Sequence, residues 1–161
     1  MEASNVALLK EYYSLMQHPE GGWFSEVYTS TARSKERAFS GSIYYLLDGP
    51  EISHFHQIDC EEIWYYHEGC GLKITMLFPD DPERCEEHLL SPRLAEGGKV
   101  MVAIPKGAIF AAENLQKDSY TFMSCATCPA FQYEGFRLVP KEEISRMFPE
   151  HAEKILRLAY D

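Results

Sequence analysis

The feature that most limits what this chain can fold into is a succession of short segments rich in Val, Ile, Tyr, Phe and Thr, which fills most of the sequence after residue 22. These residue types favour strands, and turn sequences such as Asp48-Gly49-Pro50 separate the segments. Many short strands at regular spacing predict an all-β sandwich or barrel. The expected strands are 23–30, 41–47, 53–57, 62–68, 72–78, 85–90, 99–104, 109–114, 119–127 and 131–138.

Helical spacing of apolar residues occurs only near the two ends of the chain. Leu8, Leu9, Tyr12 and Tyr13 belong to an expected N-terminal helix, which residues 18–22 end. Near the other end, prolines divide the chain into two short helical segments, 141–148 and 150–160. The chain has 161 residues without a repeat or a linker, so we expect a single domain over residues 1–161.

The overall charge argues against nucleic acid as a partner. The formal net charge is −10 and the sequence pI is about 5.0, and such a field repels phosphate backbones. Net charge does not forbid one small anionic ligand, because the local charge of a pocket can differ from that of the whole chain.

The sequence also gives an expectation about location. No stretch approaches 18 consecutive apolar residues, and the first residues have no basic segment followed by an apolar one, so we expect neither a membrane span nor a secretory signal. The five cysteines have no regular spacing. A cytoplasmic protein with reduced thiols is the expectation.

Two histidines and a glutamate form the candidate site. His54 and His56 are two residues apart in an expected strand, so both imidazoles should lie on one face. Residues 58–61 have the length of a hairpin loop that would bring Glu62 back beside them. Two imidazoles and one carboxylate suit a divalent metal with open positions for a ligand.

The spacing leaves two other interpretations open. Without a metal, Glu62 could orient one histidine as a general base. Alternatively, polar groups inside a barrel could simply hydrogen-bond to each other or to water. The remaining histidines are expected to be surface residues outside the site: His18, His67, His88 and His151.

Several motifs, in a fixed order over about residues 8 to 140, resemble the DUF985 (cupin 5) family of the RmlC-like cupins. The box at residues 18–22 makes the resemblance specific, because generic cupins lack it. The resemblance implies a double-stranded β-helix (jelly-roll) fold, a homodimer and a ligand pocket inside the barrel. The matching pieces are His18-Pro19-Glu20-Gly21-Gly22-Trp23-Phe24, 43–47, Ser53-His54-Phe55-His56, 62–64, Ile104-Pro105-Lys106-Gly107 and 128–131 with Phe136.

One departure from the metal-binding cupins bears on the metal. The position of their fourth ligand, a histidine, is Phe110 here, so the chain offers three ligands: His54, His56 and Glu62. By analogy of fold, the resemblance implies a nucleotide or nucleotide sugar as ligand.

We expect a small-molecule-binding protein; if it is an enzyme, epimerisation or isomerisation is the expected reaction. His56 would abstract a proton, Glu62 would orient it, and Tyr66 or Tyr44 would supply the acid. Trp64, Tyr44 and Phe110 are the expected ligand contacts. The alternatives are a metal-dependent enzyme using the 2-His-1-carboxylate set and a protein that binds its ligand without catalysis.

Overall fold

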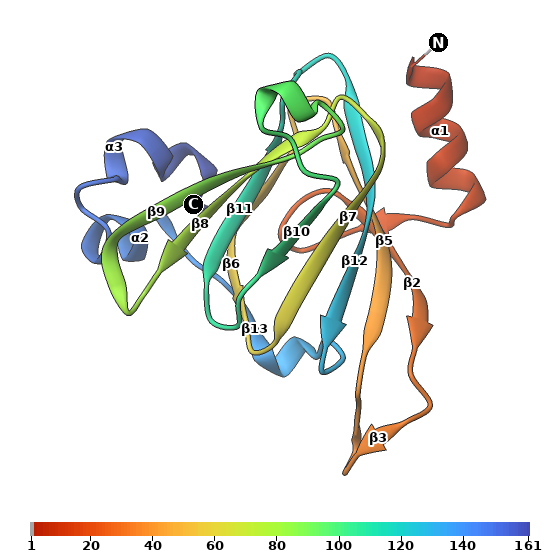
Figure 1. The fold of residues 1–161 in the computed structure, drawn as a ribbon, viewed down its shortest axis with the longest axis horizontal. Helices are drawn as coiled ribbons and strands as arrows, with labels where there is room; N and C mark the ends of the chain where they lie inside the picture. The colour runs from red at the N-terminus through yellow and green to blue at the C-terminus, as the bar shows by residue number, and fades with distance from the viewer. Residues whose placement is uncertain (1) are drawn as a thin grey trace.

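The computed structural model describes residues 2–161, with side chains from Asn5 onward, and shows two β-sheets that face each other (Figure 1). The larger sheet is six-stranded and carries the N-terminal part of the chain at one edge. Its strands, in spatial order, are β1 (Met16–Gln17), β2 (Trp23–Thr29), β5 (Gly41–Asp48), β12 (Tyr120–Cys128), β7 (Glu61–Gly69) and β10 (Met101–Ile104).

The smaller sheet is five-stranded, and neighbouring strands in both sheets pair antiparallel. A separate two-stranded hairpin, β3 (Arg33–Ser34) with β4 (Arg37–Ala38), extends from the larger sheet beyond the body of the molecule (Figure 1). The predicted all-β jelly-roll fold is confirmed. The strands of the smaller sheet, in spatial order, are β13 (Phe136–Leu138), β6 (Ile52–Ile58), β11 (Ile109–Asn114), β8 (Leu72–Phe78) and β9 (Asp81–Leu90).

Helices cover the outer face of each sheet. Helix α1 (Glu2–Tyr12) packs on the larger sheet, where Val6 joins a buried cluster with Leu46 and Phe122. At the other end, α2 (Lys141–Met147) and α3 (Ala152–Ile155) cover the smaller sheet. None of the described helices is long and apolar enough to cross a membrane.

The boundaries of some elements differ from the prediction. The expected strand 131–138 is reduced to β13, because the 3-10 helix η2 (Tyr133–Gly135) turns the chain before the strand begins. The expected helix 150–160 is divided into α3 and the 3-10 helix η3 (Leu156–Leu158). A further 3-10 turn, η1 (Leu94–Glu96), precedes β10.

Because helices cover the outer faces, apolar residues lie on both faces of each sheet. On β11, Phe110 and Ala112 face the core between the sheets, whereas Ile109 and Ala111 pack under the C-terminal helices. Strict alternation of apolar and polar residues is therefore absent, and the sequence alone does not show which side of a strand faces inward.

Strand β6 contains an irregularity that decides which of its side chains face inward. His56 pairs with Phe110 and Ser53 pairs with Ala112, so two residues of β6 lie opposite the single residue Ala111. This is a β-bulge, which shifts the inside–outside alternation by one residue. Ser53 and His56, three residues apart, consequently both face the interior.

Candidate functional site

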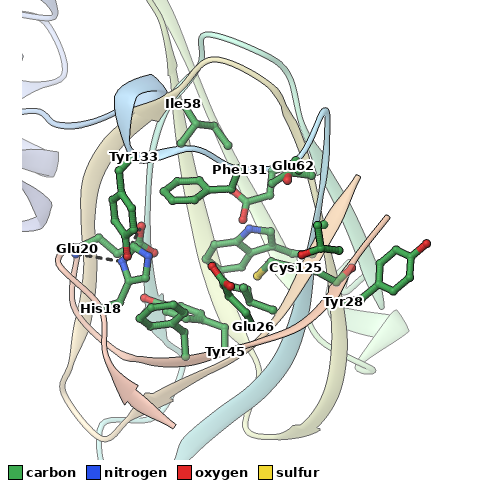
Figure 2. Close-up of a pocket in the computed structure, with 18 of the residues that line it drawn as sticks. His18, Glu20, Glu26, Tyr28, Tyr45, Ile58, Glu62, Cys125, Phe131 and Tyr133 are labelled. Carbon is green, nitrogen blue, oxygen red and sulfur yellow. Dashed lines mark hydrogen bonds and ion pairs between the residues drawn. The ribbon is translucent and has the colours of Figure 1, made fainter. Parts of the chain in front are cut away.

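A cavity lies between the two sheets, lined by residues of β2, β5, β6, β7 and β12 and by the segment before β13 (Figure 2). The volume open to the centres of water molecules is about 70 Å³, and the empty space together with the opening to solvent is about 710 Å³. Aromatic and carboxyl side chains occupy much of its wall. Those that matter most to the chemistry are His18, Glu20, His56, Glu62, Trp64 and Thr127.

The loop before β2 carries Glu20 into this cavity. Gly21 and Gly22 both have positive φ, at 106° and 75°, a conformation that favours glycine. A Cβ atom on Gly21 would lie 2.1 Å from the Ile52 carbonyl oxygen, so only glycine allows so close an approach to β6. The backbone oxygen of Glu20 accepts a hydrogen bond from His54 N–H at 2.8 Å, which fixes the loop against that strand.

Glu20 and His56 form a buried pair on this wall. His56 Nδ1 lies 2.7 Å from the His54 carbonyl oxygen, and since a carbonyl only accepts, Nδ1 carries a hydrogen. His56 Nε2 lies 3.1 Å from Glu20 Oε2. Burial lowers the pKa of His56 to about 4 and raises the pKa of Glu20. Both shifts favour the uncharged forms, a neutral imidazole beside a carboxyl group that holds its proton more tightly than usual.

Two further groups hold the Glu20 carboxyl in place. Ser53 Oγ donates to Oε1 at 2.9 Å, from the strand position that the bulge turns inward. The Glu20 N–H donates to His18 Nδ1 at 3.3 Å, and burial lowers the pKa of His18. His18 lines the cavity beside Glu20 (Figure 2), so its expected place outside the site is wrong. The glycine pair of the 18–22 box was the signal in the sequence for the loop that carries these residues.

Glu62 enters the same cavity from the opposite sheet. It lies on β7, and its side chain is buried close to the Cys125 thiol of β12 (Figure 2). Burial, followed by the nearby Glu20 carboxyl, raises the pKa of Glu62 to about 8. Two ionisable groups therefore share one pocket: Glu62 on β7 of the larger sheet, and the pair formed by His56 on β6 of the smaller sheet with Glu20 on the loop before β2.

Two polar atoms in the cavity wall have no hydrogen-bond partner. Trp64 Nε1 and Thr127 Oγ1 are buried and unpaired. The indole N–H lies near the Glu62 carboxyl, and the Thr127 hydroxyl near the Cys60 thiol, but neither pair meets the geometry of a hydrogen bond. An unpaired buried polar group costs about 1–3 kcal/mol, so both atoms are poised to bond to a ligand.

The structure does not bring His54 into the site. The bulge turns its ring away from the cavity, so that Nδ1 lies 3.3 Å from the Leu158 carbonyl oxygen and the ring contacts Tyr160. The expectation that His54 and His56 share a face is wrong, because it assumed an unbroken strand. The carboxylate beside His56 is also Glu20 rather than Glu62.

The expected ligand set does not fit a divalent metal. His54 faces outward, and both ring nitrogens of His56 already have partners. Across residues 2–161, no group of three or more His, Cys, Asp or Glu side chains has the arrangement of a metal site.

The other expected residues fall into three groups. Trp64 lines the cavity as predicted. Phe110 is not among the described lining residues, and its ring packs against His56 with the two ring centroids 4.0 Å apart. Tyr44 faces outward toward Tyr13. The Tyr66 hydroxyl donates a hydrogen bond of 2.8 Å to the Gly69 carbonyl and does not line the cavity. Neither tyrosine is therefore placed to supply an acid there. The tyrosines that line the cavity are Tyr28, Tyr45 and Tyr133.

Comparison with known proteins identifies relatives over almost the whole chain. The family model described as cupin superfamily (DUF985) matches residues 8–139. A solved protein from Shewanella oneidensis is 32% identical, with a TM-score of 0.89 and coverage of 99% of this chain and 98% of its own. A hypothetical protein from Leishmania major is 26% identical, with a TM-score of 0.87 and coverage of 96% and 98%.

More distant structures share the fold alone. A variant of oxalate decarboxylase from Bacillus subtilis is 18% identical, with a TM-score of 0.57 and coverage of 91% of this chain and 38% of that chain. No curated protein matches the sequence.

Proposed function

The chain belongs to the DUF985 family of the cupin superfamily, and on that premise we propose that it moves a proton on a small organic molecule bound between its sheets. The observation that supports this most strongly is that one cavity holds two ionisable groups: Glu62 on the larger sheet, and a Glu20–His56 pair whose histidine lies on the facing smaller sheet. Inverting a carbon centre needs a base on one face of the substrate and an acid on the other. The reaction class is therefore epimerisation or isomerisation.

Glu62 is the better base of the two groups. A catalytic group works best when its pKa lies near the working pH, and the pKa of Glu62 is about 8. In its ionised form it takes a proton from a carbon next to a carbonyl group, and that C–H bond breaks. The charge that develops on the substrate oxygen is stabilised by a buried donor, for which the unpaired Trp64 N–H is available.

The Glu20–His56 pair supplies the acid. Glu20 gives its proton to the opposite face of the carbon, a new C–H bond forms, and the negative charge passes from Glu62 to Glu20. His56 is a positioning residue in this scheme, because its Nε2 holds the Glu20 hydroxyl at 3.1 Å. Return of the proton from Glu62 to Glu20, directly or through water, restores the starting state.

A protein that binds its ligand without catalysis is the second candidate. The unpaired Trp64 N–H and Thr127 hydroxyl favour it, since they indicate a ligand regardless of any reaction. A nucleotide or nucleotide sugar as the ligand, and the homodimer, stay predictions from the family resemblance.

Solvent exchange tests the proposal. Free and nucleotide-linked keto sugars are first screened by thermal shift, where a ligand at 100 times its Kd stabilises by about 2.7 kcal/mol. The molecules that bind are then incubated with the protein in D₂O. We expect one deuterium at the carbon next to the carbonyl, and loss of that exchange in Glu62→Gln and Glu20→Gln. Binding without exchange would instead establish the second candidate.

A further inference from the structure

The described part of the cavity wall contains acidic side chains but no Lys or Arg. The acidic residues are Glu20, Glu26 and Glu62. Glu20 and Glu62 are buried, and Glu26 is exposed. The chain as a whole carries a net charge of −10, so the field outside the cavity has the same sign.

From this wall we infer that the cavity holds an uncharged polar ring and leaves any phosphate group of its ligand outside. The inference rests on the proposed small-molecule site and names the class of ligand that enters it. It narrows the expectation of a nucleotide or nucleotide sugar, because only the base or sugar ring of such a molecule suits the interior.

A phosphate inside the cavity would have no partner. Buried phosphates are held by Arg or Lys side chains or by the N-termini of helices. Among the described lining residues none is Lys or Arg, burial lowers the pKa of the two histidines, His18 and His56, and none belongs to an α-helix. Removing a phosphate from water without such a partner costs several kcal/mol.

Arg37 does not fill that role. Its Nε donates to the Ala130 carbonyl at 2.8 Å, close to the cavity wall, but its two Nη atoms bind the Asp59 carboxylate at 2.8 and 3.0 Å. The charge of Arg37 is therefore already paired by a bidentate contact.

The polar groups of the cavity suit an uncharged ring instead. The Trp64 N–H requires a hydrogen-bond acceptor, and the Thr127 hydroxyl can donate or accept. The raised pKa of Glu62 keeps most of that carboxyl protonated at pH 7, so it also offers both a donor and an acceptor. A ring that bears hydroxyl or carbonyl oxygens satisfies all three, and the aromatic wall covers its faces.

Tryptophan fluorescence reports on this cavity directly. The chain has two tryptophans, and Trp23 lies outside the cavity, where Nε1 donates to Glu51 at 3.0 Å. In Trp23→Phe, emission comes from Trp64 alone. This variant is titrated with matched pairs: nucleosides against their 5′-monophosphates, and sugars against their 1-phosphates. Separately, its quenching by iodide is compared with quenching by uncharged acrylamide, using free N-acetyltryptophanamide as the reference.

The uncharged member of each pair that binds is expected to bind at least tenfold more tightly than its phosphate. Which kind of pair responds distinguishes a base from a sugar ring. Relative to the reference, iodide is expected to quench Trp64 at least fivefold less than acrylamide, and Glu26→Gln is expected to narrow that difference.

Phosphates that bind as tightly as their uncharged partners would overturn the inference, and so would iodide quenching equal to that of acrylamide. If no pair binds, the ratio of the quenchers decides alone. Neither readout depends on turnover, so failure of the proton-transfer proposal, seen as absent deuterium exchange, is a separate result.

Discussion

His56 Nε2 and Glu20 Oε2 lie 3.1 Å apart, although the two residues come from different elements of the fold. The His54 carbonyl fixes the tautomer of His56, and Ser53 fixes the other oxygen of Glu20. This pair and Glu62 are the groups of the cavity that the proposed proton transfer uses.

Glu62 should make stability depend on pH in a defined direction. Its pKa is about 8 in the folded protein against an ordinary value of 4.5, so between these values the folded state binds more protons than the unfolded chain. The free energy of unfolding contributed by Glu62 is fully present below pH 4.5 and falls as pH rises to 8, by up to about 1.4 kcal/mol per pH unit.

Urea unfolding of wild type and Glu62→Gln at pH 5 and pH 8 checks this. His56, with its pKa lowered to about 4, acts in the other direction between pH 4 and 6.5, but it is common to both proteins. We expect Glu62→Gln to lose less stability than wild type between the two pH values. Equal losses would show that the Glu62 carboxyl is ionised in the folded protein as in the unfolded one.

The two histidines of the His-Phe-His motif should respond differently to substitution. His54→Ala removes only outward contacts, to Leu158 and Tyr160, and should cost about 1 kcal/mol or less, with ligand binding unchanged. His56→Asn should lower the rate of proton exchange by at least about 100-fold. Denaturation, thermal shift and exchange in D₂O measure these effects. A stoichiometric metal in untreated protein that is lost in both variants would show that the two histidines do share a site.

Gly21 should be the most sensitive position of the loop that delivers Glu20. Gly21→Ala places a Cβ 2.1 Å from the Ile52 carbonyl at a φ of 106°, so we expect a loss of about 2 kcal/mol or more. Gly97→Ala is the matched control, because Gly97 also has positive φ, at 82°, but nothing lies within 4 Å of the added atom. Similar losses of unfolding free energy in both variants, measured with urea, would mean that close packing of the loop on β6 contributes nothing to stability.

Thr127 tests whether the cavity holds an unpaired polar atom. Thr127→Val removes the buried hydroxyl while keeping the shape, so the free energy of unfolding without ligand should stay the same or rise by about 1 kcal/mol. Thr127→Ser keeps the hydroxyl and controls for the methyl group. A loss of stability in the valine variant alone would show that the hydroxyl has a partner in the folded protein.

Most strands could be predicted because their signals are local. Residues such as those of β5 and β8 combine high β-propensity with turn residues at their ends, and both features lie within the segment itself. The tail was less predictable, because the 3-10 turns η2 and η3 depend on how the chain packs on the smaller sheet.

The site was predicted only in part. Its geometry depends on which face of a strand each residue occupies and on contacts between residues far apart in the sequence. The alternation rule failed in β6 at the bulge after Ser53. It was uninformative in β5, where Tyr44 packs under α1 and Tyr45 faces the cavity. Glu20 meets His56 only in the folded chain, and the glycines that follow Glu20 were the one local signal of that contact.

The protonation of His56 tests the central claim most directly. Nitrogen NMR of the six histidines, with His56 identified by its loss in His56→Asn, gives both tautomer and pKa. The account predicts a neutral ring protonated at Nδ1 that does not titrate between pH 8 and 5, and whose Nε2 signal shifts in Glu20→Gln. An imidazole that titrates near 6.5 and is unaffected by Glu20→Gln would contradict it.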